Sequence, residues 1–139
     1  MRINIYTRRV RKRALFVCVE NSCRSQMAEG FARALGGGAL EAHSAGSRPS
    51  GAVNPRAAAF MKEKGVDLGL QRSKGLAELP PGPWDYLVTM GCGDACPSLP
   101  AQERRDWALP DPKGLDDAGF RAVRGEIEAR VRALIAEAA

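Results

Sequence analysis

Residues 14–25 read ALFVCVENSCRS, an apolar run that ends at a cysteine and is followed by an arginine and a serine at fixed spacing. The pattern C-x5-R-S predicts a strand that delivers Cys18 to a sheet edge, a tight turn, and a helix that starts near Ser25. Backbone N–H groups of such a turn, the helix dipole and the Arg24 guanidinium all favour a bound tetrahedral oxyanion. The same positive field favours the thiolate of Cys18, which Ser25 can stabilise with a hydrogen bond. The predicted oxyanion-binding loop consists of Val19, Glu20, Asn21, Ser22, Cys23 and Arg24.

The chain of 139 residues suits one compact domain, and its net charge of +5 is unevenly spread. Six of the basic residues precede the first predicted strand, which predicts a flexible basic arm over 1–13 and a single catalytic domain over 14–139. The domain is close to neutral, which argues against nucleic-acid binding. Neither a membrane-spanning apolar run nor a signal-peptide pattern is present, so we expect a cytoplasmic protein.

Apolar strands alternate with amphipathic helices along the chain, which predicts the α/β class with a four-stranded parallel sheet and helices on both faces. The expected strands are 14–19, 39–45, 84–90 and 104–109, and the expected helices are 25–35, 54–64, a short one capped by Ser73, and 116–138. Ligands of such sheets bind beyond the carboxyl ends of the strands. The loops after Cys18, at 91–101 and around Asp111 are therefore predicted to meet at one edge.

Two of these loops carry further candidate residues. Cys92 and Cys96 lie in MGCGDACP, where they are predicted to exchange disulfides, although incidental loop cysteines or a four-cysteine zinc site are alternatives. Asp111 lies between two prolines and is either an ordinary turn residue or a general acid for a leaving oxygen. His43, the only histidine, is predicted to be structural.

Taken together, VCVENSCRSQMAEGFA, SAG at 44–46, NPRA at 54–57, VTMGCGDACP and the Asp111–Pro112 pair resemble the thioredoxin-coupled arsenate reductases. Those enzymes share the low-molecular-weight protein tyrosine phosphatase fold, a flavodoxin-like three-layer sandwich. The resemblance extends over roughly residues 14–135. The nucleophile motif is shared with the phosphatases, whereas the downstream cysteine pair distinguishes the reductases.

This resemblance implies a mechanism and a set of partners. Cys18 would attack arsenate, Asp111 would protonate the departing oxygen, and Cys92 would attack Cys18 as arsenite leaves. Cys96 would then attack Cys92, and thioredoxin would reduce the resulting Cys92–Cys96 disulfide; no cofactor and no metal are expected. Some members hold a potassium ion, and Asn21, Glu29 and Ser44 match its ligands, but Lys74 replaces an acidic ligand, so that an ammonium group could take the role of the ion.

Two other functions remain open from the residues. A phosphotyrosine phosphatase would use the same loop, although SAGSRPSG and DPKG lack the aromatic side chains that the phosphatases place there. A zinc-stabilised or redox-sensing domain would use all four cysteines without turnover.

Overall fold

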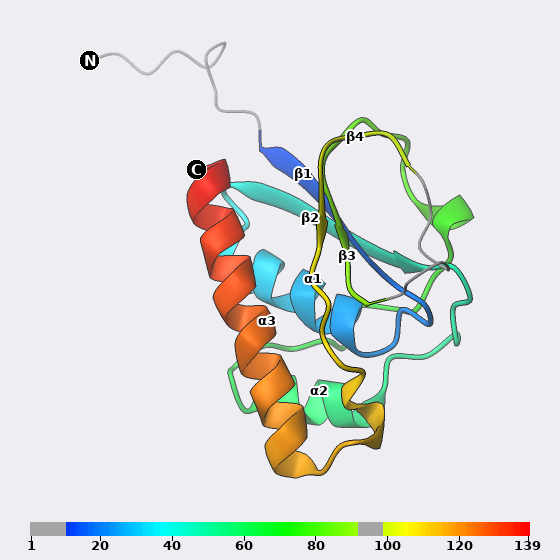
Figure 1. The fold of residues 1–139 in the computed structure, drawn as a ribbon, viewed down its shortest axis with the longest axis vertical. Coiled ribbons are helices and arrows are strands. Elements are labelled where there is room, and N and C mark those ends of the chain that lie inside the picture. Colours follow the sequence, from blue (N-terminus) through cyan, green and yellow to red (C-terminus); the bar gives the residue numbers. More distant parts are fainter. Residues whose placement is uncertain (1–10, 92–98) are drawn as a thin grey trace.

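The computed structural model describes residues 11–91 and 99–139, and it forms a four-stranded parallel sheet of order β2-β1-β3-β4. Figure 1 shows this sheet with the long C-terminal helix to its left. The strands are β1 (Lys12–Cys18), β2 (Leu40–Gly46), β3 (Trp84–Thr89) and β4 (Ala101–Asp106). The predicted α/β class and parallel sheet are thus confirmed.

The strand register brings the carboxyl ends of the strands to one edge. Cys18 pairs with Gly46 across β1 and β2, while Val17 and Asp106 both pair with Thr89 of β3. The residues that follow Cys18, Thr89 and Asp106 therefore leave the sheet on the same side, as expected for a ligand site in a parallel sheet.

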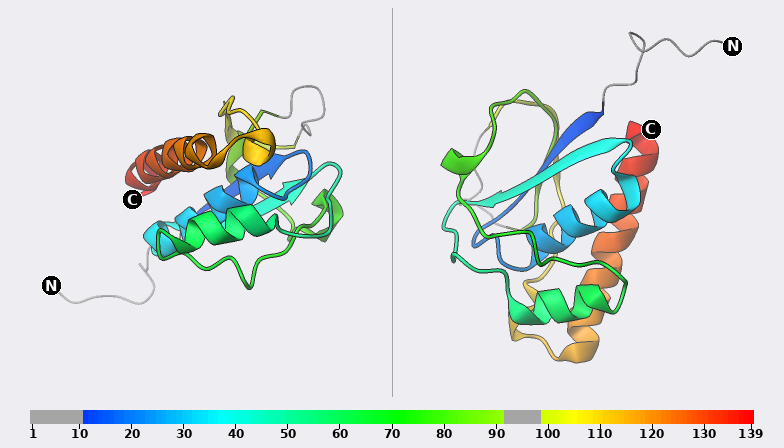
Figure 2. Two further views of the ribbon diagram at one scale, coloured as in Figure 1. Left: turned by 90° about the horizontal axis from the view of Figure 1, so that it is seen from below. Right: turned by 180° about the vertical axis from the view of Figure 1, so that it is seen from behind.

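Helices α1 (Arg24–Gly36), α2 (Pro55–Lys62) and α3 (Asp117–Ala138) bury their apolar side chains in one cluster with Phe16. The opposite face of β1, with Leu15 and Val17, packs against the 3-10 helix η2 (Leu76–Glu78) and its neighbours. Figure 2 shows the three long helices grouped on one side of the sheet. Among residues 11–91 and 99–139, the second face therefore carries this single helical turn in place of an α-helix.

Two helices begin at a residue whose side chain caps the helix end. The Asn54 side chain accepts the Arg56 N–H at the start of α2, and Asp116 accepts the Gly119 N–H at the start of α3. Each bond satisfies a backbone donor that the helix itself leaves free.

The predicted cap at Ser73 is wrong. The short helix η2 begins after Gly75, and the Ser73 hydroxyl donates to the carbonyl of Glu20 at 2.9 Å and accepts the Gly51 N–H at 3.2 Å. Ser73 therefore supports the loop after Cys18, because a short hydroxyl side chain can bridge two neighbouring backbone segments as well as cap a helix.

The predicted boundary of the basic arm also needs correction. Lys12 and Arg13 belong to β1, and the Arg13 guanidinium bonds Glu41 at 2.8 Å and lies 4.5 Å from the Trp84 ring centroid. These contacts allow a charged residue to extend the strand. Residues 1–10 of the predicted arm lie outside the described residues.

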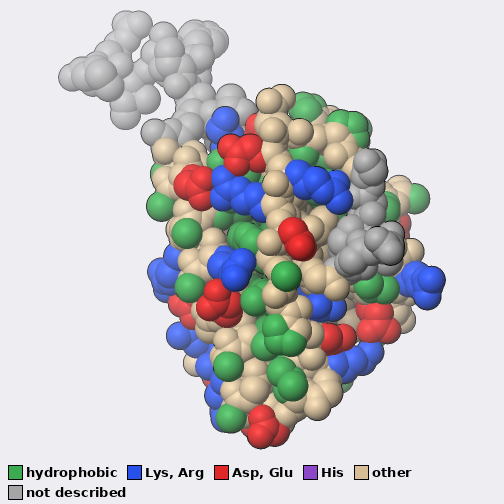
Figure 3. Space-filling model, in the orientation of Figure 1, with side chains coloured by type: hydrophobic (Ala, Val, Ile, Leu, Met, Phe, Trp, Pro, Cys, Tyr) green, Lys and Arg blue, Asp and Glu red, His purple; other side chains and the backbone are tan. Residues whose placement is uncertain are grey.

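The fourth strand lies three residues earlier than predicted, at Ala101–Asp106. Trp107 follows it and packs on Phe16, with ring centroids 5.8 Å apart, while His43 pairs with Glu41 at 2.9 Å. Acidic and basic side chains are interspersed over the face in Figure 3. Among the described residues, no helix has the length and apolar composition to cross a membrane.

Candidate active site

The loop after β1 turns its carbonyl groups outward. These carbonyls belong to Val19 (bonded by Arg48 N, 2.8 Å), Glu20 (Ser50 N, 3.0 Å), Asn21 (Gln26 Nε2, 3.0 Å) and Ser22 (Asn54 N, 3.0 Å). In a planar trans peptide the next N–H points opposite to the carbonyl. The four N–H groups from Glu20 to Cys23 therefore face the inside of the loop, where they form a site for an anion.

Gly46 permits the close packing that holds this loop. A Cβ on Gly46 would lie 2.5 Å from the carbonyl oxygen of Val19 and 2.9 Å from the Asn21 nitrogen. Both are backbone atoms that cannot move without opening the loop. The glycine of SAG thus has a steric role in shaping the site.

Asn21 determines the orientation of the Ser25 hydroxyl beside Cys18. Its Oδ1 accepts the Lys74 backbone N–H at 2.9 Å, which assigns the amide because a backbone nitrogen can only donate. Its Nδ2 then donates to Ser25 Oγ at 2.8 Å, and Ser25 Oγ lies 2.8 Å from Cys18 Sγ. With the Ser25 oxygen already accepting, the hydroxyl proton is free to point at sulfur, which stabilises the thiolate.

A second amide shell supports Asn21, which has a left-handed φ of 50°. Gln26 donates to both Asn21 oxygens and to the Arg72 carbonyl, and its own Oε1 accepts from Gln71 at 2.8 Å. The contribution of Gln26 and Gln71 was not predicted, because the partners lie 45 residues apart in sequence. The one signal in the sequence is the amide residue Gln26 directly after Ser25 in NSCRSQ, because its side chain can bond the preceding turn.

Arg24 is buried beneath the loop and is aimed by the segment after β4. Its Nη1 donates to the Leu109 carbonyl at 2.9 Å, and its Nη2 lies 4.0 Å from Asp111 Oδ2. Gly91, with φ of 81°, leaves room for the guanidinium, since a Cβ there would lie 2.7 Å from Arg24 Nη1 and 2.9 Å from the Leu109 oxygen. The arginine is thus held in place from two loops.

These groups surround one cavity of about 320 Å³. Its lining residues are Cys18, Val19, Glu20, Ser22, Cys23, Arg24, Arg48, Asp111 and Lys113. Asp111 Oδ1 accepts the Lys113 N–H at 3.0 Å, so the carboxyl is fixed while its side chain stays 47% exposed. A thiol, inward N–H groups, an arginine and a carboxyl group together are able to bind an oxyanion, attack it and protonate a leaving oxygen.

A family model described as "Low molecular weight phosphotyrosine protein phosphatase" matches residues 13–139. The chain belongs to this family. It is 43% identical to the "Glutaredoxin arsenate reductase" of Synechocystis sp. over 91% of this chain and 98% of that protein. It also resembles a solved structure titled "An arsenate reductase in the phosphate binding state", with a TM-score of 0.82, 40% identity, and coverage of 92% of this chain and 99% of that one.

A further structural relative is a thioredoxin-dependent arsenate reductase of Corynebacterium glutamicum. The TM-score is 0.72 at 34% identity, over 89% of this chain and 60% of that chain. The chain therefore matches a family described by a phosphatase activity and at the same time resembles proteins named as arsenate reductases.

Cys23 lines the same cavity as Cys18 but differs from it in environment. Burial, with smaller contributions from the neighbouring Asp111 and Cys18, raises the pKa of the Cys23 thiol to about 12. A thiol that stays protonated at neutral pH is a poor nucleophile. Cys23 therefore shapes the loop without competing with Cys18.

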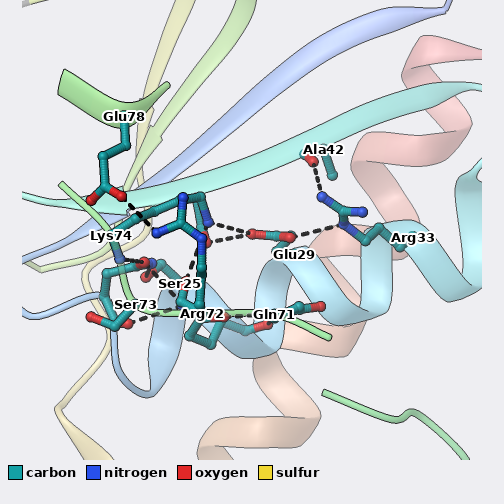
Figure 4. Close-up of polar contacts among 12 residues, drawn as sticks. Ser25, Glu29, Arg33, Ala42, Gln71, Arg72, Ser73, Lys74 and Glu78 are labelled. Carbon is teal, nitrogen blue, oxygen red and sulfur yellow. Dashed lines mark hydrogen bonds and ion pairs between the residues drawn. The ribbon is translucent and has the colours of Figure 1, made fainter. Parts of the chain in front are cut away.

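Figure 4 shows the charges behind the loop, where the carboxylate of Glu29 is almost fully buried. One oxygen accepts from the Ser44 hydroxyl and lies 3.5 Å from Lys74 Nζ, and the other lies 2.8 Å from Arg33 Nε. Both carboxylate oxygens thus have partners. These contacts place the Lys74 ammonium group where the resemblance implies a potassium ion in other members.

Cys92 and Cys96 lie outside the described residues. The chain reaches them through Gly91, which lies against Arg24. Among residues 11–91 and 99–139, no group of three His, Cys, Asp or Glu side chains could hold a metal ion.

Proposed function

We propose that this protein is an arsenate reductase that uses Cys18 as its nucleophile and a protein thiol as its reductant. One observation carries the proposal: Cys18 Sγ lies 2.8 Å from the Ser25 hydroxyl, at the base of a cavity with Arg24 and Asp111 on its wall. The similarity to proteins named as arsenate reductases supports arsenate as the oxyanion.

The first step forms a bond from Cys18 sulfur to arsenic and breaks one arsenic–oxygen bond. The inward N–H groups and Arg24 would hold the other oxygens, and Asp111 would give its proton to the departing oxygen, which leaves as water. Asp111 suits this role because it lines the cavity together with Cys18 while its side chain remains open to solvent for reprotonation.

The second step is a sulfur exchange. Cys92 thiolate would attack Cys18 sulfur, the sulfur–arsenic bond would break, and its electron pair would reduce arsenic(V) to arsenic(III), which leaves as arsenite. Cys96 would then attack Cys92, which frees Cys18 and leaves a Cys92–Cys96 disulfide. Reduction of that disulfide by an external dithiol closes the cycle.

We propose thioredoxin as this external reductant, by similarity to the thioredoxin-dependent relative. The relative named as a glutaredoxin arsenate reductase makes glutaredoxin the alternative to test. We also propose a cytoplasmic location, since the cycle starts from free thiols, which the cytoplasm keeps reduced.

Arsenate turnover should be measured with thioredoxin, thioredoxin reductase and NADPH, beside a glutathione and glutaredoxin system. Cys92→Ser and Cys96→Ser should each abolish turnover while hydrolysis of an aryl phosphate, which needs only the first step and water, survives. Cys18→Ser should abolish both activities. Full-rate arsenate turnover by Cys92→Ser and Cys96→Ser would disprove the three-cysteine cycle.

A second candidate is a phosphatase, which the family description favours. The same cavity binds phosphate as well as arsenate, so a slow hydrolysis of small aryl phosphates is expected. No aromatic side chain is among the described residues that line the cavity, so an aryl ring gains no stacking there. A fast reaction with phosphotyrosine peptides and none with arsenate would reverse the order of the two candidates.

A further inference from the structure

An ion pair joins the two sides of the cavity rim. Lys113 Nζ lies 2.6 Å from Glu20 Oε1, although the two residues are 93 positions apart in sequence. Glu20 comes from the oxyanion-binding loop and Lys113 from the segment after β4, and both line the cavity. Their side chains are 42% and 49% exposed, as expected at the mouth of a cavity.

Lys113 lies next to the group that would protonate the leaving oxygen. Its backbone N–H bonds Asp111 Oδ1 at 3.0 Å, so its side chain starts beside that carboxyl. In an in-line displacement the leaving group departs opposite the attacking sulfur, on the side of the general acid. A substituent on the leaving oxygen would therefore extend toward Asp111 and the adjacent Glu20–Lys113 pair, whereas an unsubstituted oxygen adds no bulk there.

From this geometry we propose that the Glu20–Lys113 ion pair determines specificity: it narrows the mouth of the cavity, so that organic phosphate esters bind there more weakly than free tetrahedral oxyanions. The inference rests on the proposed function in one respect, that the cavity binds an oxyanion. It adds the residues that separate a free oxyanion from an ester, which the loop alone does not distinguish.

The size of the effect follows from the exposure of the pair. A half-exposed ion pair is weak, so little free energy is needed for an ester to displace it. Removing the pair should therefore change the ratio of ester to oxyanion binding by about two- to fivefold. The ion pair can be removed by a single neutralising substitution, whereas the lack of aromatic side chains among the described cavity residues cannot.

The experiment measures binding without turnover. Inorganic phosphate and phenylphosphonate are each titrated as protectants of Cys18 against iodoacetamide, and alkylation of the Cys18 peptide is followed by mass spectrometry. The quantity compared is the ratio of the phenylphosphonate Kd to the phosphate Kd. Since both ligands share the oxyanion contacts, general damage to the loop largely cancels in this ratio.

Wild-type protein should give a ratio above one. Glu20→Gln and Lys113→Met should each lower it about two- to fivefold, and the exchange of the two charges in Glu20→Lys/Lys113→Glu should restore it. Arg48→Gln is the matched control, because Arg48 lines the same cavity and has no ion-pair partner among the described residues. Its ratio should stay within about twofold of wild type.

The inference would be overturned by a wild-type ratio near one, by single variants that leave the ratio unchanged, or by an exchange variant that fails to restore it. An equal drop in Arg48→Gln would also overturn it, since net charge would then explain the effect. Failure of both ligands to protect Cys18 would instead contradict the proposed oxyanion site. The two failures are therefore distinguishable.

Discussion

Replacing Asn21 tests whether one amide side chain holds the nucleophile loop together. The side chain makes three hydrogen bonds, to Ser25 Oγ, Gln26 Nε2 and the Lys74 N–H, and the residue is fully buried. Each net hydrogen bond contributes about 1 kcal/mol, so Asn21→Ala should lose about 3 kcal/mol from these bonds. The left-handed φ of 50° adds about 1 kcal/mol of strain for alanine, which gives about 4 kcal/mol in total.

The assay is urea unfolding followed by circular dichroism, with the free energy of unfolding extrapolated to water. Asn21→Gly should be about 1 kcal/mol less destabilised than Asn21→Ala, because glycine accepts the left-handed conformation. If Asn21→Ala stays within about 1 kcal/mol of wild type, the side chain does not hold the loop and the reasoning is refuted.

A third variant separates stability from reactivity. Asn21→Asp keeps both acceptor bonds but turns the donor facing Ser25 into an acceptor, so the Ser25 proton is drawn to the new carboxylate and away from Cys18. Alkylation of Cys18 at neutral pH should then slow by about tenfold, the weight of one hydrogen bond to a charged group. An unchanged alkylation rate in folded Asn21→Asp would show that Ser25 is not oriented by this amide.

Three other predictions concern the same cavity. Ser25→Ala should slow iodoacetamide labelling of Cys18 by about tenfold, whereas Ser25→Thr should retain most of the rate because it keeps the hydroxyl. With a pKa of about 12, above the unfolded value of 9.0, the Cys23 thiol should resist iodoacetamide labelling from pH 7 to 9. The same raised pKa should stabilise the folded state below pH 9, and this contribution should be lost as the pH rises toward 12, as measured by urea unfolding at each pH. Gly91→Ala should lower aryl phosphate hydrolysis at least tenfold because its Cβ would contact the buried guanidinium and a carbonyl oxygen, while Gly51→Ala, which has similar φ but open space, should lower only stability.

The part of the site formed by residues 14–25 was predictable because the residues that define it are neighbours in the sequence. An apolar run, a turn and a helix start follow each other within 14–25, and the chemistry of C-x5-R-S depends on neighbours in sequence. Strand β4 was misplaced by three residues because it is an edge strand. Its residues Glu103 and Arg104 are exposed and charged, so the sheet is held there by backbone pairing with β3 and little apolar pattern marks it.

The residues that hold the loop from other parts of the chain were not predictable, because contacts between distant segments cannot be read from a single sequence. Ser73 was expected to cap a helix and instead bonds Glu20, and Lys113 reaches the same residue from 93 positions away. Glu20 thus has its carbonyl held from behind the loop and its carboxylate held across the cavity mouth. A loop fixed from both sides keeps its N–H groups aimed at one point before any ligand arrives, and such preorganisation is what makes hydrogen-bond donors effective in a transition state. The general chemistry therefore follows from the motif, whereas the proposed selectivity depends on a contact, Glu20 with Lys113, that only the fold brings about.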